Sequence, residues 1–363
     1  MNTLIRLLGC GLLAMTADLC AQGTATVVAT PAVGYYKLTA RAASDSFVAI
    51  PMVQQSLIVS HLSAITPNSV TLSSFGIQDG AYAPGANGGY YLQFTSGKLA
   101  GLCYEIVGNS GDIVTLKTLG DDLTSHPLGS ISVGDSGDLV RIRPLWTIGA
   151  VFGIDPTQVR LDAIPGFNGS IYSGGDAILL PDNSSIGSPK PPANSVAYVT
   201  GMGWRSPGAT AIDASLAELW PGVSFTIRRE ASTAVSVPVI GYVSADPFTK
   251  GIPAITASSD FSISLAYPIP VALANSALYG SARMVINPSS DALHLGDHVL
   301  TFSVARQGFA PPPEFRFYVS GGHWFETMTS ADQTPLQPDE GLVLRLNGPH
   351  PASYWFQLPP QNL

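Results

Sequence analysis

The chain has 363 residues, of which 45% are hydrophobic and only 12% charged, and its formal net charge at pH 7 is −8. This acidic balance, with no Lys/Arg cluster beyond Arg228-Arg229, argues against nucleic acid or an anionic membrane surface as a partner. The 37 glycines and 29 prolines argue against long helices, so the composition is typical of a turn-rich β protein.

The N-terminus has the pattern of an export signal. Arg6 is the only charge in the first 17 residues, and an apolar core follows it before Leu19-Cys20-Ala21. We expect a cleavable signal helix at residues 1–21 and a mature chain that begins at Gln22. No other stretch approaches the roughly 18 apolar residues that a membrane span needs. The sequence therefore predicts an exported protein (extracellular, cell-surface or periplasmic) without a transmembrane anchor.

Short apolar or alternating runs, bounded by Gly, Pro, Asn or Asp, recur along the chain and predict strands. Helical patterns are limited to short stretches at residues 211–219 and 269–278. We expect an all-β fold with several antiparallel β-sandwich or barrel-like units. The predicted strands are residues 46–53, 69–72, 90–94, 102–107, 113–116, 139–143, 177–180, 196–200, 225–229, 261–265, 299–304, 315–320 and 342–346.

Signal cleavage leaves Cys103 as the one cysteine, so no internal disulfide is expected. Cys103 lies in a strand-like run with no histidine or basic cluster near it in sequence. This setting favours a buried, inert thiol over a nucleophile.

An internal duplication is the most informative feature of the sequence. Residues 198–204 read YVTGMGW and residues 318–324 read YVSGGHW. A Gly-Asp step before a strand at Gly175-Asp176 recurs at Gly296-Asp297, and a Leu-x-Pro step before a strand with an arginine occurs in both halves. The offset stays near 120 residues, which indicates a duplicated domain rather than a solenoid.

The beginning of each copy is matched less clearly. The run SGDLVRI at residues 136–142 parallels SSDFSIS at residues 258–264. Fainter echoes link Ser44-Asp45-Ser46-Phe47 with Ser259-Asp260-Phe261, and Gly34-Tyr35 with Gly241-Tyr242. From the stronger match we expect an N-terminal β domain at residues 22–137 and two repeats with the same strand order at residues 138–243 and 244–363. Trp204 should superpose on Trp324, Tyr198 on Tyr318 and Arg228 on Arg345.

Gly134-Asp135-Ser136-Gly137 carries the four letters that flank the nucleophile of chymotrypsin-like serine proteases. In those enzymes, further glycines let two backbone N–H groups converge as an oxyanion hole. Here Asp138 follows instead, and its carboxylate would oppose negative charge at that place. The second copy lacks the four letters altogether. We therefore expect a tight turn, with no histidine in hydrogen-bonding reach of the Ser136 hydroxyl.

Two groups of polar residues are candidate metal sites. His294-Leu295-Gly296-Asp297-His298 offers nitrogen and oxygen ligands, but zinc needs three or four of them in a tetrahedral array, and the first copy has Ala177 in place of His298. Asp121-Asp122 is a lone acidic pair, and a turn or cap is the simpler reading. No catalytic residue, metal site or cofactor is predicted.

The repeated aromatic residues are the best binding candidates. Trp204 and Trp324, with Tyr198 and Tyr318, bracket Gly-rich turns, so their rings could lie at a loop rim and stack on sugars. The simpler alternative is that each Tyr/Trp pair caps the core of a β-sheet.

Several stretches resemble an uncharacterised family of secreted proteins found in Verrucomicrobia and related bacteria. The resemblance covers most of residues 33–265 and implies an exported bacterial β-rich protein, with no functional residues to transfer. Its motifs are Val33-Gly34-Tyr35, SDSFVAIPM at residues 44–52, the Gly-Asp-x-Val-x-Ile-like strand that leads into PLWTIGAVF at residues 144–152, and LLPDN at residues 179–183 ahead of Tyr198 and Trp204-Arg205.

The sequence thus favours an exported, non-enzymatic structural or cell-surface interaction protein whose partner, a glycan or another protein, is unknown. A carbohydrate-binding module or adhesin that uses the repeated tryptophans is the alternative. A secreted hydrolase with a site assembled from distant loops is a third reading.

Overall fold

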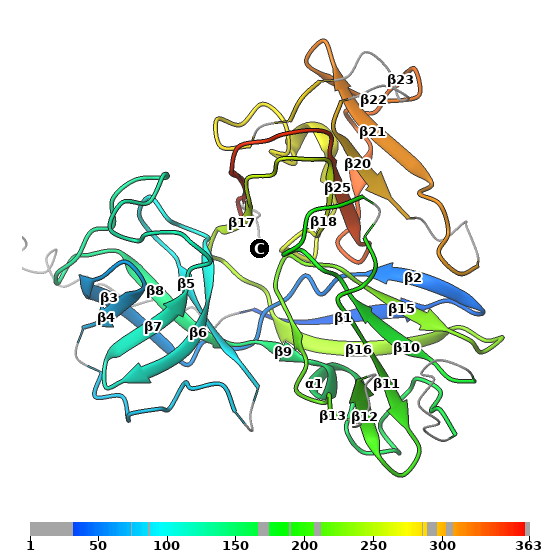
Figure 1. Cartoon of the computed structure of the whole chain (residues 1–363), viewed down its shortest axis with the longest axis horizontal. Coiled ribbons are helices and arrows are strands. Elements are labelled where there is room, and N and C mark those ends of the chain that lie inside the picture. The colour runs from blue at the N-terminus through cyan, green and yellow to red at the C-terminus, as the bar shows by residue number, and fades with distance from the viewer. Residues whose placement is uncertain are drawn as a thin grey trace, which may run out of the picture. The chain divides into compact units, whose positions relative to one another are not determined.

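The computed structural model describes residues 32–359, except residues 74, 86–87, 166–173, 189, 207–211, 285, 289–295 and 303–307. The expected signal peptide lies outside the described residues. The fold is all-β, as the sequence predicted, and its strands pair antiparallel in several sheets (Figure 1). No helix among the described residues is long and apolar enough to span a membrane.

One unit is a closed six-stranded barrel with the strand order β3-β4-β7-β6-β5-β8. Side chains alternate between its two faces. In β8, for example, Val140 and Ile142 lie fully buried in the barrel core, while Arg141 and Arg143 point outward. The barrel strands are β3 (Ile58–Ile65), β4 (Ser69–Leu72), β5 (Tyr90–Phe94), β6 (Cys103–Ser110), β7 (Ile113–Lys117) and β8 (Leu139–Pro144).

The second unit, here named copy 1, is built around a six-stranded sheet of order β2-β15-β10-β11-β12-β13. A two-stranded ribbon of β1 and β16, named ribbon 1, and the short pair β9–β14 accompany it. Its elements are β1 (Val33–Ala40), β2 (Ser44–Val48), β9 (Trp146–Thr147), α1 (Ile148–Phe152), β10 (Ala177–Leu180), β11 (Asn194–Val199), β12 (Gly203–Ser206), β13 (Ile212–Asp213), β14 (Glu218–Leu219), β15 (Phe225–Arg229) and β16 (Val235–Tyr242).

The third unit, copy 2, repeats this plan with a sheet of order β18-β25-β20-β21-β22-β23, a ribbon of β17 and β26 named ribbon 2, and the pair β19–β24. Of the two short helices expected, the one near residues 269–278 is a single 3-10 turn, η1, whereas the described residues 212–219 contain the short strands β13 and β14. The elements are β17 (Phe248–Ile252), β18 (Ser259–Ile263), β19 (Val271–Ala272), η1 (Leu273–Asn275), β20 (His298–Thr301), β21 (Phe315–Ser320), β22 (His323–Glu326), β23 (Thr329–Ser330), β24 (Pro335–Leu336), β25 (Leu342–Leu346) and β26 (Ser353–Gln357).

The two copies therefore share one strand order, but copy 1 begins elsewhere than the stronger sequence match suggests. Residues 139–144, expected to open the first repeat, form β8 and pair with β3 and β5 of the barrel. The place of β18 is taken in copy 1 by β2, which pairs with β15 far along the chain (Figure 1). The barrel is thus an insertion between β2 and β9, and copy 1 comprises residues 33–52 and 146–242. A boundary at residue 138 would cut the barrel.

The expected match of Tyr198 with Tyr318 is wrong by one residue. Ala177 pairs with Ala197 and with Arg228, whereas His298 pairs with Tyr318 and with Arg345. Ala197 therefore corresponds to Tyr318, and Tyr198 to Val319. The tryptophans still correspond, because Trp204 pairs with Tyr198 and Trp324 with Val319. The hairpin of copy 1 has one more residue in its turn, which hides the shift in the sequence.

Each copy covers one edge of the other copy's sheet, at β2 in copy 1 and at β18 in copy 2. Asp45 N–H donates to Gly308 O and Asp260 N–H donates to Gly187 O, both at 3.0 Å. Gly308 N–H donates to Ser44 Oγ at 2.6 Å, and Gly187 N–H to Ser259 Oγ at 3.3 Å. The same residues of each copy meet the same loop of the other, which is the pattern of a twofold interface between identical subunits.

Candidate functional site

The four aromatic residues proposed for binding lie in the interior. The side chains of Trp204 and Trp324 are 1% and 2% exposed, and Tyr198 and Tyr318 are also buried. Trp204 packs edge-on against Tyr198 with ring centroids 5.4 Å apart, and its indole N–H donates to Gly153 O at 2.6 Å. These rings cannot offer a face to a sugar at a loop rim, so the reading as core residues holds.

The tyrosines differ in role because they lie on opposite faces of their sheets. Tyr198 belongs to the core cluster of copy 1. Tyr318 lies on the other face of β21, where its ring contacts Phe325 and His298 and its hydroxyl donates to Thr327 O.

Gly134-Asp135-Ser136-Gly137 forms a turn at the rim of the barrel, as expected. Gly137 N–H donates to Gly134 O at 2.9 Å. The nearest histidine contact is between His61 Nδ1 and the carbonyl oxygen of Gly137, at 2.6 Å. Ser136 is exposed, and among the described residues its hydroxyl has no hydrogen bond to a histidine. The turn thus has a structural explanation.

The candidate metal ligands also have structural partners. Asp297 is fully buried and accepts backbone hydrogen bonds from Asn287 at 2.6 Å and Asn347 at 2.8 Å. His298 is buried in β20, and His294 lies outside the described residues. Asp122 closes a turn by accepting from Thr124 N–H at 2.8 Å. In the described part of the chain no group of three or more His, Cys, Asp or Glu side chains is placed to hold a metal ion.

Asp297 has a counterpart in copy 1, Asp176. The sequence shows both aspartates as part of a repeated Gly-Asp motif but does not show their role. Asp176 accepts from the backbone N–H of Asp162 at 2.8 Å and of Glu230 at 2.9 Å, the positions that match Asn287 and Asn347. Both carboxylates therefore tie the segment before a sheet strand to the end of a neighbouring strand. The side-chain partner differs, since Arg229 pairs with Asp176 and His350 with Asp297.

The barrel contacts the segment between the two copies through a polar cluster. Arg141 and Arg143, on the outer face of β8, both reach Asp246 Oδ2, at 2.8 and 3.0 Å. Gln93 donates to Pro247 O at 2.9 Å. Tyr267 of copy 2 donates its hydroxyl to Asp246 O at 2.6 Å. Arg141 and Arg143 thus hold the barrel to the segment that joins the two copies.

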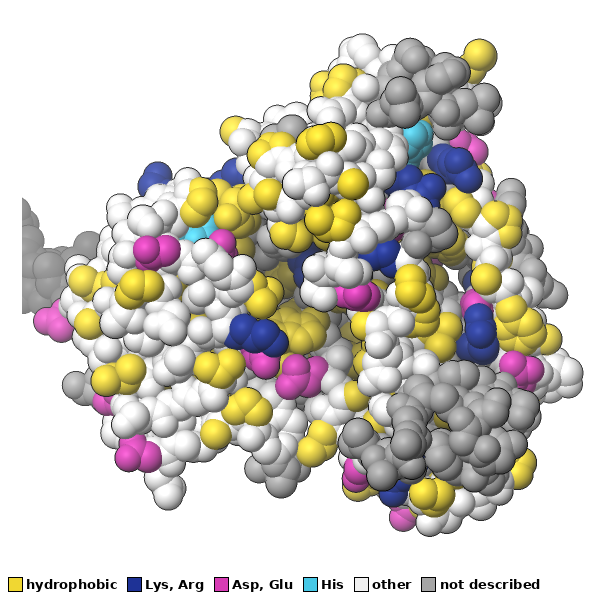
Figure 2. All heavy atoms as spheres, viewed as in Figure 1, with side chains coloured by type: hydrophobic (Ala, Val, Ile, Leu, Met, Phe, Trp, Pro, Cys, Tyr) yellow, Lys and Arg dark blue, Asp and Glu magenta, His cyan; other side chains and the backbone are white. Residues whose placement is uncertain are grey.

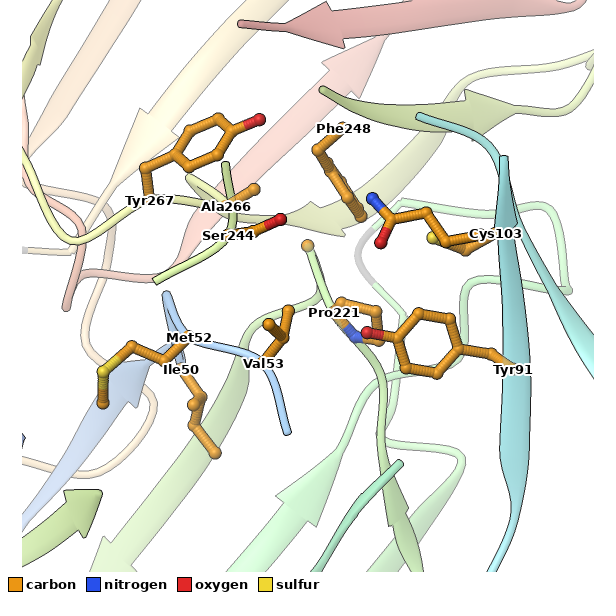
Figure 3. Close-up of a pocket in the computed structure, with 12 residues that line it drawn as sticks. Ile50, Met52, Val53, Tyr91, Cys103, Pro221, Ser244, Phe248, Ala266 and Tyr267 are labelled. Atoms are coloured by element: carbon orange, nitrogen blue, oxygen red, sulfur yellow. The ribbon is translucent and has the colours of Figure 1, made fainter. Parts of the chain in front are cut away.

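A small enclosed cavity lies beside this cluster (Figure 3). Its volume is about 10 Å³, which is room for about one water molecule rather than a substrate. Barrel, copy 1 and copy 2 all contribute to its wall, and in Figure 3 Tyr91 and Cys103 approach it from the barrel, opposite Ser244 and Tyr267. The lining residues are Ile50, Met52, Val53, Tyr91, Gln93, Cys103, Pro221, Gly222, Ser244, Phe248, Ala266 and Tyr267.

Cys103, for which the sequence favours a buried and inert thiol, lies at the start of β6. It is partly buried, its thiol points to Gly101 O at 3.6 Å, and burial raises its pKa from 9.0 to about 12. Lys250 of β17 is also partly buried, and burial lowers its pKa from 10.5 to about 8. A thiol with a raised pKa is a poor nucleophile at neutral pH.

Several large apolar side chains are exposed on the surface. On the face drawn in Figure 2, hydrophobic side chains lie scattered in small groups among polar atoms, and charged side chains are sparse. The most exposed group on one sheet face belongs to ribbon 1, where Val33, Tyr35 and Ile240 are 63%, 65% and 68% exposed. Tyr35 and Ile240 are direct cross-strand partners, so they form one continuous surface. This outer face of ribbon 1 is the candidate interaction site.

Comparison with known proteins adds no assignment: no family model, no curated protein and no solved structure matches this chain.

Sequence reasoning missed the outer face of ribbon 1. Its signal was present in the alternation Val33-x-Tyr35-x-Lys37, which places three side chains on one side of a strand. Alternation alone does not say which side is covered, because both faces of this strand carry large apolar residues.

Proposed function

We propose that the chain is an exported, non-enzymatic structural or cell-surface interaction protein. The observation that supports the proposal is a difference between two sets of residues: those that both copies share form structural contacts, and those found in ribbon 1 alone are exposed. The polar residues that both copies share, Asp45 with Arg228 and Asp260 with Arg345, hold strands and copies together. The large exposed apolar residues of ribbon 1 contribute to no core.

The four paired aromatic residues support this proposal rather than the carbohydrate-binding alternative. Trp204 and Trp324 fill the cores of the two copies, where their role is packing. A carbohydrate-binding module would need other exposed rings. The resemblance to secreted bacterial proteins and the pattern of residues 1–21 support export.

The test is expression of the full chain with a C-terminal epitope in a bacterium, followed by fractionation and N-terminal sequencing. We expect the epitope outside the cytoplasm, on a chain that begins at Gln22, and retention of the purified protein by cell envelopes. Cytoplasmic protein that keeps residues 1–21 would contradict export. If the purified protein binds a glycan array but is not retained by the proteins of the cell envelope, the carbohydrate alternative is favoured. Labelling by a hydrolase activity probe would favour an enzyme.

A further inference from the structure

The two ribbons occupy equivalent places in the two copies, yet in the described part of the chain ribbon 2 alone has its outer face covered. In ribbon 2 the barrel covers this face. Thr249 donates its hydroxyl to Ala100 O at 2.8 Å and its N–H to Gly101 O at 2.9 Å. Tyr354 joins the barrel core and packs on His126, with ring centroids 5.6 Å apart. Ribbon 1 has no such cover among the described residues.

The outer face of ribbon 1 combines apolar surface with one positive charge. Val33, Tyr35 and Ile240 are each more than 60% exposed, and Pro238 is exposed beside them. Lys37 is the cross-strand partner of Pro238 and lies on the same face, two residues from Tyr35. An occupant should therefore offer apolar side chains with a negative charge among them.

The barrel has a surface of that kind where the turn between β6 and β7 meets the segment after β4. This surface, here named the barrel tip, consists of Phe75, Asp79, Asp112 and Ile113. Phe75 and Ile113 are 50% and 48% exposed. Asp112 lies between them and accepts from Phe75 N–H at 3.2 Å and Ile77 N–H at 3.0 Å. These backbone hydrogen bonds, chiefly that of Ile77, hold the pKa of Asp112 below its ordinary value, so the carboxylate stays charged. Asp79, bonded to Gly111 N–H, adds a second carboxylate.

We propose that the outer face of ribbon 1 binds the barrel tip of a second copy of this chain. Apolar residues then meet apolar residues, and Lys37 of one molecule faces Asp112 of the next. The contact joins two different surfaces, so each molecule of a pair keeps its other surface free for a further neighbour. Such head-to-tail contacts give rings or open filaments. The inference rests on the proposed interaction role and names the partner.

A symmetric contact between two ribbon 1 faces fits less well. It would bring the two Lys37 side chains toward each other in a contact with no acidic partner on the ribbon. The net charge of −8 also opposes unspecific association of whole molecules, so a contact must gain from specific pairs.

Sedimentation velocity of the purified full chain over a range of concentrations tests the proposal. We expect species larger than the monomer to appear as concentration rises. Tyr35→Glu and, separately, Ile113→Glu should each raise the concentration of half-assembly at least tenfold. Met328→Glu, at an apolar side chain 87% exposed on copy 2, is the matched control and should leave assembly unchanged.

Disulfide trapping identifies the surfaces that meet. Chains carrying Tyr35→Cys are mixed with chains carrying Ile113→Cys under mild oxidation. The proposal predicts mixed dimers in excess of either self-dimer. Preferential Tyr35→Cys self-dimers would overturn it in favour of the symmetric contact. A chain that stays monomeric at every concentration would also overturn it, and if such a monomer still binds cell envelopes, self-association fails while the proposed function stands.

Discussion

At the scale of single residues, each copy contains an equivalent Asp–Arg pair that stabilises its sheet. Asp45 binds Arg228 through two hydrogen bonds of 2.8 Å, and Asp260 binds Arg345 in the same way. Two parallel hydrogen bonds fix the orientation of both partners, which a single contact would not. Because each pair joins an edge strand to its neighbour, it also fixes the register of that edge.

Lys250 should make stability depend on pH. Its folded-state pKa of about 8 lies below the unfolded value of 10.5, so between these values the unfolded chain binds more protons and stability rises with pH. In Lys250→Met, which keeps the length of the side chain, this rise should be lost. Above pH 8, the unfolding free energy of wild type should therefore rise relative to that of the variant, by at most about 1.4 kcal/mol per pH unit. Urea unfolding at pH 7 to 9 measures it, and a difference independent of pH would contradict the burial of a charged amine.

Cys103 should react slowly in the folded protein. With a pKa of about 12, only about one thiol in ten thousand is ionised at pH 8. We expect labelling by a maleimide or disulfide reagent at least 100-fold slower than for a model thiol. The same protein in urea supplies the control, since unfolding should restore the ordinary rate. Native labelling at the rate of the model thiol would count against a buried, inert cysteine.

At the scale of elements, the main feature is the insertion of a complete barrel into copy 1. In the sequence, β2 precedes the barrel and β9 follows it. After the barrel, the chain comes back to copy 1, where β15 pairs with β2. The barrel then covers the outer face of ribbon 2 through the turn at Gly101. Insertion at a loop between strands keeps the ladder of copy 1 intact, which is why both copies retain one strand order.

Gly101 should be essential for the contact between barrel and ribbon 2. Its φ is +91°, and a Cβ there would meet Thr249 N and the carbonyl carbon of Phe248 at 2.6 Å. Gly111 has φ +55° with nothing within 4 Å, so Gly111→Ala is a control for backbone strain alone. We expect Gly111→Ala to cost about 1 kcal/mol of stability and Gly101→Ala at least about 2 kcal/mol more. Urea unfolding compares them, and equal costs would show that the close approach is not needed.

The sequence predicted the class of fold. The local patterns on which the predicted duplication rests, namely Gly-Asp steps, the Tyr and Trp residues around a hairpin and an arginine strand, lie in two sheets that have the same strand order. The sequence could not decide where copy 1 begins. Asp45 and Asp138 each precede or enter a strand, and only strand pairing between distant residues selects Asp45 as the match of Asp260. The match of Tyr198 with Tyr318 failed for a related reason. The strands before the two hairpins are offset by one residue, and the extra residue in the turn of copy 1 compensates for this offset, so that Trp204 again matches Trp324.

At the scale of the whole molecule, the two copies resemble a symmetric dimer joined in one chain. Ala49 N–H donates to Asp339 O and Ser264 N–H to Gly222 O, both at 3.2 Å, which repeats the exchange seen at Asp45 and Asp260. Edge strands of this kind would otherwise offer unpaired backbone groups to other chains. The copies thus protect each other's edges at β2 and β18, while the outer face of ribbon 1 is not covered by any described residue.

The coupling free energy between Asp45 and Arg228 tests this account most directly, because it asks which aspartate completes copy 1. It is obtained from the unfolding free energies of Asp45→Ala, Arg228→Ala, the double variant and wild type, with Asp138→Ala combined with Arg228→Ala as the matched cycle. We predict a coupling of about 2 kcal/mol for Asp45 with Arg228 and a value near zero for Asp138 with Arg228. A coupling of Arg228 with Asp138 and none with Asp45 would contradict the insertion of the barrel and the equivalence of β2 and β18.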